Sequence, residues 1–482
     1  MNRPIRWHDY LTVNLHFTGL TVLTQTMTPL VLPLLVQHFV GEAAQGRFYG
    51  RLRLWGLMTA VLAQAAAGMF SDRLCGGIGR RRPFIAAGTL LSLFCLGLIA
   101  FSARLDGLSG YRLLFAALIL MMIASNTAQG PLQALIPDLI PSQARGRFSG
   151  VKALLEVPIP LMLVAAIIGP MVGRGALDEA LLLVSILLLI TLGVTMFAPE
   201  NPLTTPAQAM PWARLLRLSA MTILFALSIL GGGALVDVGA RLLHTASLPL
   251  ALVVMGSIGL AAMCLPIGLG LWAALRISLG TDFHHQPAFA WWVVNRLAFL
   301  TGSTNLASFT LYFFQGRLGY TGSQAAVPAS RMLLVVGVFV LLSVLPAGAL
   351  ADHKGEKSLL LASGLLGAVG TAVLLSVPRL EVVYIGAVLL GIAGGAFYAV
   401  NWALGTRLAP AAHAGRYLGI ANLAGAGAGA VGAYVGGPIA DFFAGYYPQA
   451  PAAGYVLLFG IYGALFLLSM TAILPVHTEQ NE

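Results

Sequence analysis

The sequence predicts an all-α polytopic membrane protein with two six-helix bundles plus an extra central helix pair, 12 to 14 transmembrane helices in total. Of the 482 residues, 58% are hydrophobic and only 9% are charged, whereas a soluble domain carries about 25% charged residues. The apolar residues form runs of about 20, long enough to cross a hydrocarbon core about 30 Å thick. These runs lack a two-residue alternation, which favours helices over a barrel. An internal repeat is the third observation.

The apolar runs divide the chain into three parts. The first part holds six expected helices, near 11–38, 53–70, 84–102, 112–136, 148–173 and 180–198. A segment rich in Pro and Thr follows, and then come two more runs, near 219–243 and 247–275. After a polar stretch the last six runs lie near 288–315, 330–350, 357–377, 381–406, 416–441 and 453–475. We therefore expect a first bundle, a linker with two extra helices, and a second bundle, at 1–200, 201–287 and 288–482.

The charge distribution bears on partners and topology. The net charge is +10, but Lys and Arg lie in short loops between apolar runs, which excludes a basic nucleic-acid-binding face. Arg3 and Arg6 precede a long apolar segment, which we interpret as an uncleaved first helix. Basic residues are slightly more frequent in loops on the side of the N-terminus. We expect a multi-pass inner-membrane protein, monomeric in the lipid bilayer, with both termini cytoplasmic.

Two segments of the chain repeat each other. ALIPDLIPSQARGRFSG at 134–150 matches ALGTRLAPAAHAGRYLG at 403–419 without gaps, at a constant offset of 269 residues. Arg147 and Arg416 correspond in this match. Duplicated helix bundles are common in transporters, so the repeat supports two related bundles.

The loop after each half's second helix repeats as well, as GMFSDRLCGGIGRRRP from Gly68 and GALADHKGEK from Gly348. Each copy places an Asp four residues after a Gly and follows it with basic residues. The Gly permits close helix approach, and the Asp can accept bonds from helix amides or pair with Arg, which would hold one face of the protein shut. Ordinary charged loops are the alternative. The expected gating residues are Gly68, Asp72, Arg73, Arg80, Arg81, Gly348, Asp352, Lys354, Arg147 and Arg416.

These loops resemble the signature G-x-x-x-D-R-x-G-R-R of the major facilitator superfamily. The copy from Gly348 fits the signature almost residue for residue. The first copy carries five extra residues and looks like that of the glycoside, pentoside and hexuronide cation symporters and the related sucrose transporters. The resemblance covers both six-helix halves and implies a secondary transporter that works by alternating access. The extra central helix pair is not part of the twelve-helix pattern.

Two further motifs fit the superfamily only in part. NTAQG at 126–130 places Asn126 where many relatives carry an Arg, which speaks against a proton relay based on that Arg. Gly169, Pro170 and Gly173 match part of the antiporter signature on the fifth helix and give weak support for efflux.

Few ionisable residues lie inside the expected helices, where each costs about 2.5–3.5 kcal/mol at the bilayer centre. Lys152 and Glu156 stand four residues apart on the fifth helix and can pair on one face. A structural ion pair is one interpretation, and proton coupling through Glu156 with Lys152 exchanging partners is the other. Asp138, at the end of the fourth helix, is a second coupling candidate and a candidate gate residue.

Polar residues follow one side of the first helix of each half. Asn14, Thr18, Thr21, Gln25 and Thr28 recur at steps of three and four, which predicts a stripe facing a cavity. Amides and aromatic rings together suit a sugar, whose hydroxyls need donors and acceptors while its ring faces pack on indole. Bonding between helices is the alternative for each residue. The expected substrate-binding residues are Asn14, Thr21, Gln25, Asn126, Gln129, Gln133, Trp292, Asn295, Arg296, Asn305, Asn401 and Trp402.

One arginine has several possible roles, and one glycine-rich motif is excluded as a nucleotide site. Arg296 lacks an obvious local acid; it could bind an anionic substrate, pair with Glu156, or serve structure. Gly427, Gly429 and Gly432 spell a dinucleotide motif but lie in a transmembrane helix without a preceding strand, so helix packing explains them better. No catalytic constellation, cofactor site or metal site is indicated.

The sequence therefore predicts a secondary transporter for a small polar solute, a sugar or glycoside being favoured, with a proton as the coupling ion. Efflux of a drug or amphipathic compound is one alternative. A membrane factor that assembles a complex or delivers a pigment, with His16 as an axial ligand, is an alternative of another class.

Overall fold

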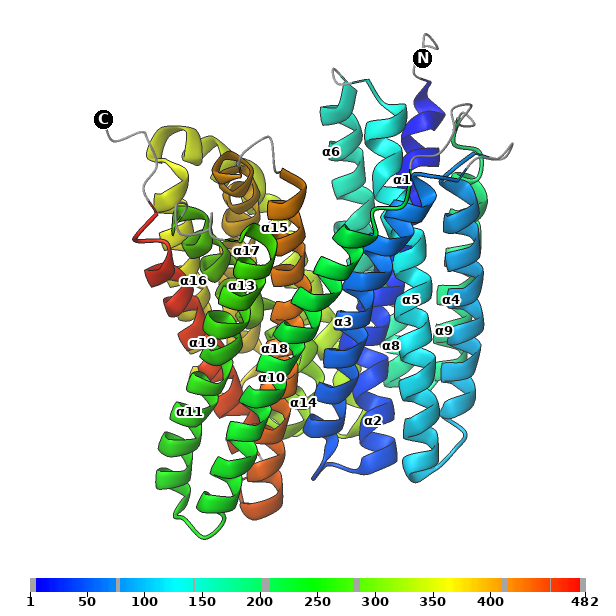
Figure 1. The fold of residues 1–482 in the computed structure, drawn as a ribbon. Coiled ribbons are helices and arrows are strands. Elements are labelled where there is room, and N and C mark those ends of the chain that lie inside the picture. The colour runs from blue at the N-terminus through cyan, green and yellow to red at the C-terminus, as the bar shows by residue number, and fades with distance from the viewer. Residues whose placement is uncertain are drawn as a thin grey trace. The chain divides into compact units, whose positions relative to one another are not determined.

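The computed structural model describes residues 6–74, 79–141, 144–200, 209–280, 287–409, 414–450 and 452–476. Within these ranges every long element is a helix and no strand occurs, which confirms the all-α prediction (Figure 1). Thirteen described helical stretches are long and apolar enough to cross a membrane. The expected span at 288–315 is also helical but is not among these thirteen.

The chain folds into two compact units. Unit 1 comprises 1–39 and 59–216, and unit 2 comprises 40–58 and 217–482. The boundary falls inside one continuous helix, α3 (Gln45–Ser71), whose first half packs in unit 2 and whose second half packs in unit 1. The expected boundaries at 200 and 287 stay a prediction.

Unit 1 is built around α1 (Trp7–Thr26), whose Val13, Phe17 and Val22 are buried. The other helices of unit 1 are α2 (Leu32–Val40), the second half of α3, α4 (Arg82–Ser102), α5 (Gly107–Leu139), α6 (Arg145–Glu156), α7 (Pro158–Leu163), α8 (Gly169–Gly173) and α9 (Leu177–Thr195). The single helix expected at 148–173 is interrupted at Val157, because Pro158 and Pro160 cannot donate backbone hydrogen bonds.

Unit 2 holds the extra helix pair together with the last six spans. The extra pair consists of α10 (Trp212–Leu243) and α11 (Leu248–Leu265) with α12 (Leu271–Leu279). The remaining helices are α13 (Pro287–Ser308), α14 (Thr310–Leu318), α15 (Ala326–Lys354), α16 (Glu356–Ser376), α17 (Leu380–Leu408), α18 (Ala414–Tyr446) and α19 (Ala453–Ala472). Stacked rings fill its core, with centroids of Phe299 and Phe397 3.8 Å apart.

Helix α18 is the most deeply buried span of unit 2, and its glycines explain how. A Cβ on Gly427 would lie 2.4 Å from Phe225 of α10, one on Gly429 would lie 2.8 Å from Leu57 of α3, and one on Gly432 would lie 2.2 Å from Asn305 of α13. Because these three glycines have no side chain, α10, α3 and α13 can each pack closely against α18. The resemblance of these glycines to a nucleotide loop is a product of helix packing, as the sequence analysis expected.

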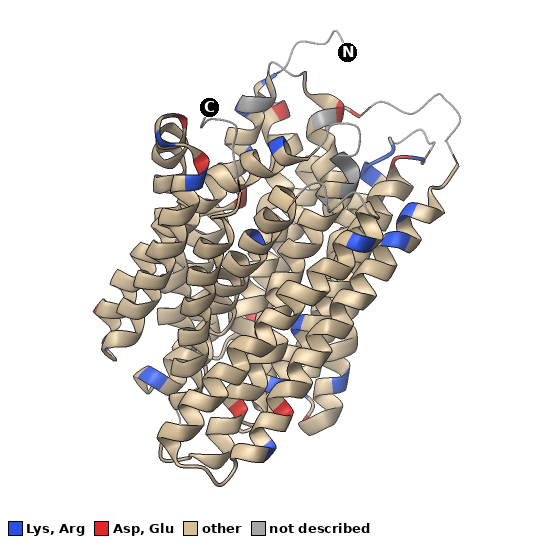
Figure 2. Cartoon of the chain, turned by 60° about the vertical axis from the view of Figure 1, so that its left-hand side comes forward, with Lys and Arg blue, Asp and Glu red and all other residues tan. Residues whose placement is uncertain are grey.

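Charged residues are rare in the middle of the helices and gather toward the helix ends (Figure 2). This distribution is expected where the surrounding solvent is hydrocarbon, because a charge near the bilayer centre must find a partner inside the protein. The exceptions on the helices are therefore the first places to look for function.

Close packing of α4 on α5 provides a test of the unit 1 fold. A Cβ on Gly88 of α4 would lie 2.5 Å from the backbone oxygen of Ala124, whereas one on Gly97 of the same helix would meet no described atom within 4 Å. We expect Gly88→Ala to destabilise the protein by about 1–3 kcal/mol through overpacking and Gly97→Ala to have little effect. Thermal unfolding of the purified variants in detergent measures the difference, and equal melting temperatures would contradict the packing.

Candidate functional site

The predicted gating loop of unit 1 contains a buried arginine that joins two helix ends. The Arg81 side chain is 5% exposed, and its guanidinium lies 2.5 Å from Asp72 at the end of α3 and 3.0 Å from Asp138 near the end of α5. Arg80 lies 2.6 Å from the same Asp138 oxygen. Asp138, expected either to couple protons or to gate, therefore belongs to this ion-pair cluster.

An acidic residue that the sequence analysis did not select completes this cluster. The Glu200 carboxylate accepts the backbone N–H groups of Arg80, Arg81 and Arg82 at 3.0, 2.7 and 3.2 Å, at the start of α4. The first amides of a helix lack partners and carry partial positive charge, so a carboxylate there is favourable. The signal in the sequence is an acidic residue directly after the last span of the first half.

Unit 2 carries the same kind of ion pair with its charges exchanged. Glu356, which begins α16, pairs with Arg407 near the end of α17. Arg407 stands 269 residues after Asp138, the same offset as in the repeat. The loop residue is basic and the helix-end residue acidic in unit 1, and the reverse holds in unit 2. The repeat thus keeps the contact between these two elements while it changes the sign of each charge.

The other predicted gating residues differ in their exposure and in their contacts. Asp352 and Lys354 are exposed at the end of α15 and make no ion pair among the described residues, Arg147 is exposed, and the Arg416 side chain lies outside them. The guanidinium of Arg73 donates to the Met69 carbonyl at 2.6 Å. A Cβ on Gly68 or Gly348 would meet no described atom within 4 Å. The close approach of α5 to α3 depends on Gly130 of α5, whose Cβ would lie 2.7 Å from the Gln64 carbonyl oxygen and 3.4 Å from the backbone nitrogen of Gly68.

A second set of polar contacts holds the start of α3 within unit 2. Asp441 of α18 is 9% exposed and accepts the backbone N–H groups of Gly46 and Arg47, both at 2.7 Å. The Arg47 guanidinium pairs with Asp237 of α10 at 2.5 Å. The Gln45 amide donates to the Tyr455 hydroxyl at 2.9 Å. We call Asp441 with the two amides of Gly46 and Arg47 the α3 latch; the sequence analysis missed it, although Asp441 is the one carboxylate in the described part of α18.

The polar stripe on α1 mostly joins helices within unit 1. The Asn14 amide donates to the Phe148 carbonyl at 3.3 Å, and the Thr18 hydroxyl donates to the Leu155 carbonyl at 2.6 Å. His16 is fully buried, with one ring nitrogen 3.0 Å from the Thr191 hydroxyl and the other 2.8 Å from the Thr89 hydroxyl. Both nitrogens are therefore engaged, which argues against His16 as an axial ligand for a pigment.

The remaining predicted residues of unit 1 are more accessible. Lys152 and Glu156 form an ion pair at 3.4 Å with partly exposed side chains, and the Lys152 ammonium lies 4.2 Å from the centre of the Phe17 ring. Gln133 is exposed and accepts a bond from Gln64 of α3 at 3.3 Å. The side chains of three more predicted residues are also partly exposed: Thr21, Gln25 and Gln129. Asn126 is the exception, because it is buried; among the described residues it bonds only to its own helix, through the Met122 carbonyl at 2.8 Å.

In unit 2 four of the predicted residues form one connected network. Arg296 donates to the Asn401 side-chain oxygen at 2.7 Å, the Asn401 amide donates to Asn295 at 3.3 Å, and the Trp292 indole N–H donates to the Asn401 carbonyl at 2.9 Å. Asn295 in turn donates to Ser469 of α19. Asn305 lies apart and donates to the Ala428 carbonyl at 3.0 Å. Asn14, Asn295 and Asn305 thus bond between helices here, as the alternative interpretation held, and their roles in binding stay predictions.

Partly exposed faces of α5 and α17 match through the repeat. At the offset of 269, Gln129 corresponds to Tyr398 and Gln133 to Trp402. Tyr398 is 48% and Trp402 is 42% exposed. The two glutamines lie one helical turn apart on α5, and the two aromatic residues lie one turn apart on α17. Amides on one repeat and aromatic rings on the other are the two kinds of group that recognise a sugar. Among the described residues no cluster of His, Cys, Asp and Glu could hold a metal ion.

The α3 latch generates a prediction for stability. We expect Asp441→Ala to lower the free energy of unfolding by about 1–3 kcal/mol, because the amides of Gly46 and Arg47 lose their carboxyl acceptor. Asp237→Ala is the matched control: it removes a carboxylate from the partly exposed pair with Arg47 and should cost less than about 1 kcal/mol. Thermal unfolding in detergent measures both, and equal shifts would show that Asp441 does not hold the start of α3.

Comparison with known sequences gives partial matches. Residues 291–482 match the family model described as Major Facilitator Superfamily. Sucrose transport protein SUT4 of Oryza sativa subsp. indica is 37% identical over 105 residues, covering 18% of this chain and 17% of that protein. Sucrose transport protein SUC3 of Arabidopsis thaliana is 29% identical over 144 residues, covering 27% of this chain and 23% of that protein. The matches thus span about a fifth of the length of these relatives.

Comparison with solved structures covers nearly the whole chain. A D-xylose-proton symporter superposes with a TM-score of 0.65 at 15% identity, covering 98% of both chains. A nucleoside transporter superposes with a TM-score of 0.64 at 11% identity, covering 98% of this chain and 100% of that one. At such identities the likeness lies in the fold. The family model thus matches the C-terminal helices of this chain, and nearly the whole chain shares the fold of these solved transporters.

Proposed function

We propose that this protein is a secondary active transporter that moves a small polar solute, a sugar or glycoside, across the inner membrane by alternating access. A proton is the proposed coupling ion, and the protein acts as a monomer with both termini in the cytoplasm. One observation carries the proposal: repeat-related positions on α5 and α17 present amides in unit 1 and aromatic rings in unit 2, on faces that are not buried in either unit.

The chemistry of these two faces favours a sugar over a lipophilic compound. Gln129 and Gln133 supply both donors and acceptors, which sugar hydroxyls require in matched numbers. Tyr398 and Trp402 supply flat rings for the apolar faces of a sugar ring. The partial similarity to sucrose transport proteins supports the same substrate class.

The Lys152–Glu156 pair is the proposed coupling site. It lies on α6 with both side chains partly exposed. Protonation of Glu156 would remove its attraction for Lys152, and the ammonium would keep only its contact with the Phe17 ring. A proton can therefore change which group holds Lys152, and this is the step that links the proton to the conformational cycle.

Uptake into proteoliposomes tests the substrate class. With an inward proton gradient we expect accumulation of sucrose or a related glycoside, and Trp402→Leu should lower its kcat/KM about tenfold, the equivalent of ~1.4 kcal/mol. Trp272→Leu on α12 is the control, because Trp272 is 53% exposed and lies outside the proposed site. If no sugar or glycoside accumulates and lipophilic cations do, sugar transport is wrong.

The coupling site has its own test. Glu156→Gln cannot release a proton, so we expect gradient-driven uptake to be lost while exchange of labelled for unlabelled substrate at equal pH persists. Glu179→Gln, on an exposed carboxylate at the start of α9, should leave both activities intact. Retention of full gradient-driven uptake by Glu156→Gln would place the coupling group elsewhere.

A further inference from the structure

Arg296 is a charge inside unit 2 for which the described residues of that unit provide no carboxylate partner. It stands nine residues after the first residue of α13, which places its backbone about 14 Å along the helix. A charged side chain at such depth is costly and is normally turned toward a partner or a water-filled cavity. A structural ion pair within the described part of unit 2 therefore does not explain why an arginine stands at this position.

The guanidinium of Arg296 uses few of its donors. Of its five N–H groups, one donates to Asn401 at 2.7 Å, and the Nε atom is buried without a hydrogen-bond partner among the described residues. The guanidinium carbon lies 5.1 Å from the Trp402 ring centre and 5.9 Å from that of Trp292. Contacts with indole faces stabilise a cation but neutralise no charge. Donors and positive charge thus remain for an anion.

The neighbours of Arg296 hold it in one orientation. Asn401 is fully buried and is itself bonded to Asn295, while the Trp292 indole is fixed by its bond to the Asn401 carbonyl. Gly405 of α17 leaves space for that indole, since a Cβ there would lie 2.1 Å from the Trp292 ring. A donor group held in place before the ligand arrives loses little entropy when it binds.

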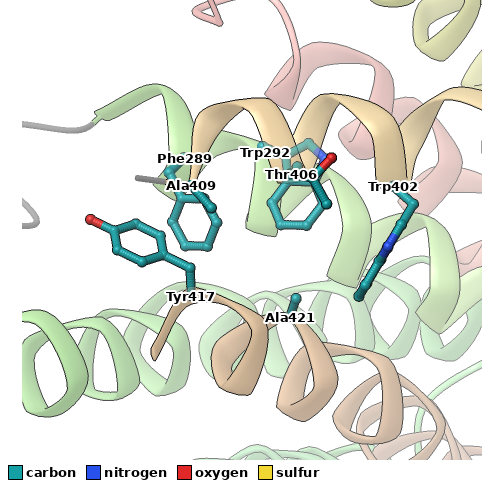
Figure 3. Close-up of a pocket in the computed structure, with 8 residues that line it drawn as sticks. Phe289, Trp292, Trp402, Thr406, Ala409, Tyr417 and Ala421 are labelled. Atoms are coloured by element: carbon teal, nitrogen blue, oxygen red, sulfur yellow. The ribbon is translucent and has the colours of Figure 1, made fainter. Parts of the chain in front are cut away.

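A small aromatic pocket lies next to Arg296, toward the ends of the same helices. Phe289 and Trp292 of α13, Thr406 of α17, and Tyr417 and Ala421 of α18 line it, and Trp402 closes one side (Figure 3). The Phe289 and Tyr417 rings meet edge to face with centroids 4.6 Å apart.

The pocket and the guanidinium are continuous because they share two side chains. Trp292 and Trp402 line the pocket and also contact Arg296, one helical turn further along α13. On α18 a Cβ on Gly425, one turn beyond Ala421, would lie 3.9 Å from the guanidinium. A ligand could therefore place a charged group on Arg296 and a flat apolar ring on the exposed face of Trp402 beside the pocket.

We propose that Arg296 and this pocket bind an organic monoanion, and that the transported glycoside carries an acidic group attached to a flat apolar ring. The proposal rests on the transport function proposed above and specifies its substrate. The acidic group receives two parallel N–H bonds from the guanidinium, the ring packs on the partly exposed Trp402 at the edge of the aromatic pocket, and the sugar lies beyond it. A neutral disaccharide would leave the Arg296 charge without a counter-ion.

Two probes of the same shape test the charge. We would measure binding of para-carboxyphenyl glucoside and its neutral amide, para-carbamoylphenyl glucoside, to purified protein by calorimetry, and uptake of both into proteoliposomes. The wild type should bind the acid at least about tenfold more tightly than the amide. Arg296→Gln should abolish this preference, and Arg296→Lys should retain part of it, because an ammonium keeps the charge but not the planar fork.

Matched measurements separate the possible failures. Arg276→Gln, on an exposed arginine of α12, should keep the preference. If Arg296→Gln does not fold, the two probes still decide with the wild type alone. Equal affinities for acid and amide, or an equal loss of both in Arg296→Gln, would overturn the anion site and leave sugar transport standing. Binding of benzoate through Arg296 without uptake of any glycoside would keep the anion site and refute sugar transport.

Discussion

The structure depends on one constraint: in hydrocarbon, a charge or a backbone amide without a partner is expensive, so polar groups must be satisfied inside the protein. The described ion pairs follow it at the helix ends. Arg81 joins Asp72 to Asp138, and Glu356 pairs with Arg407. Asp441 satisfies two amides at the start of α3. Polar groups hold together helices that the hydrophobic effect, weak in lipid, does not.

The internal repeat shows which feature of these ion pairs is kept in both halves. Asp138 and Arg407 stand at equivalent positions and have opposite charges, yet each pairs with the loop after the second helix of its own half. What the two halves share is therefore the attraction between a loop and a helix end, while the sign of each charge is free to change. Such a contact suits a gate, because an ion pair at a helix end can be made and broken by a change of partner without refolding a helix.

The proposed binding positions differ in chemistry between the two halves. Gln129 and Gln133 on α5 offer hydrogen bonds, whereas Tyr398 and Trp402 on α17 offer rings. Arg296 adds a fixed cation beside the rings. A solute with an apolar ring and an acidic group would use the rings and the cation of unit 2. Specificity would come mainly from the cation, because a site built around an unpaired charge strongly disfavours a ligand that cannot neutralise it.

The sequence by itself determined the all-α membrane fold, the helical spans and the repeat, because span length and hydropathy are set by the bilayer and are local along the chain. It also singled out Arg296, since a charge in an apolar run is visible without a structure. Only the tertiary structure decided that α18 glycines admit three neighbours, and that Glu200 and Asp441 cap helices distant in sequence. It also decided that the neighbours of Arg296 in unit 2 are two indoles and an amide. These contacts join residues up to 395 positions apart, and no local pattern encodes which helix ends will meet.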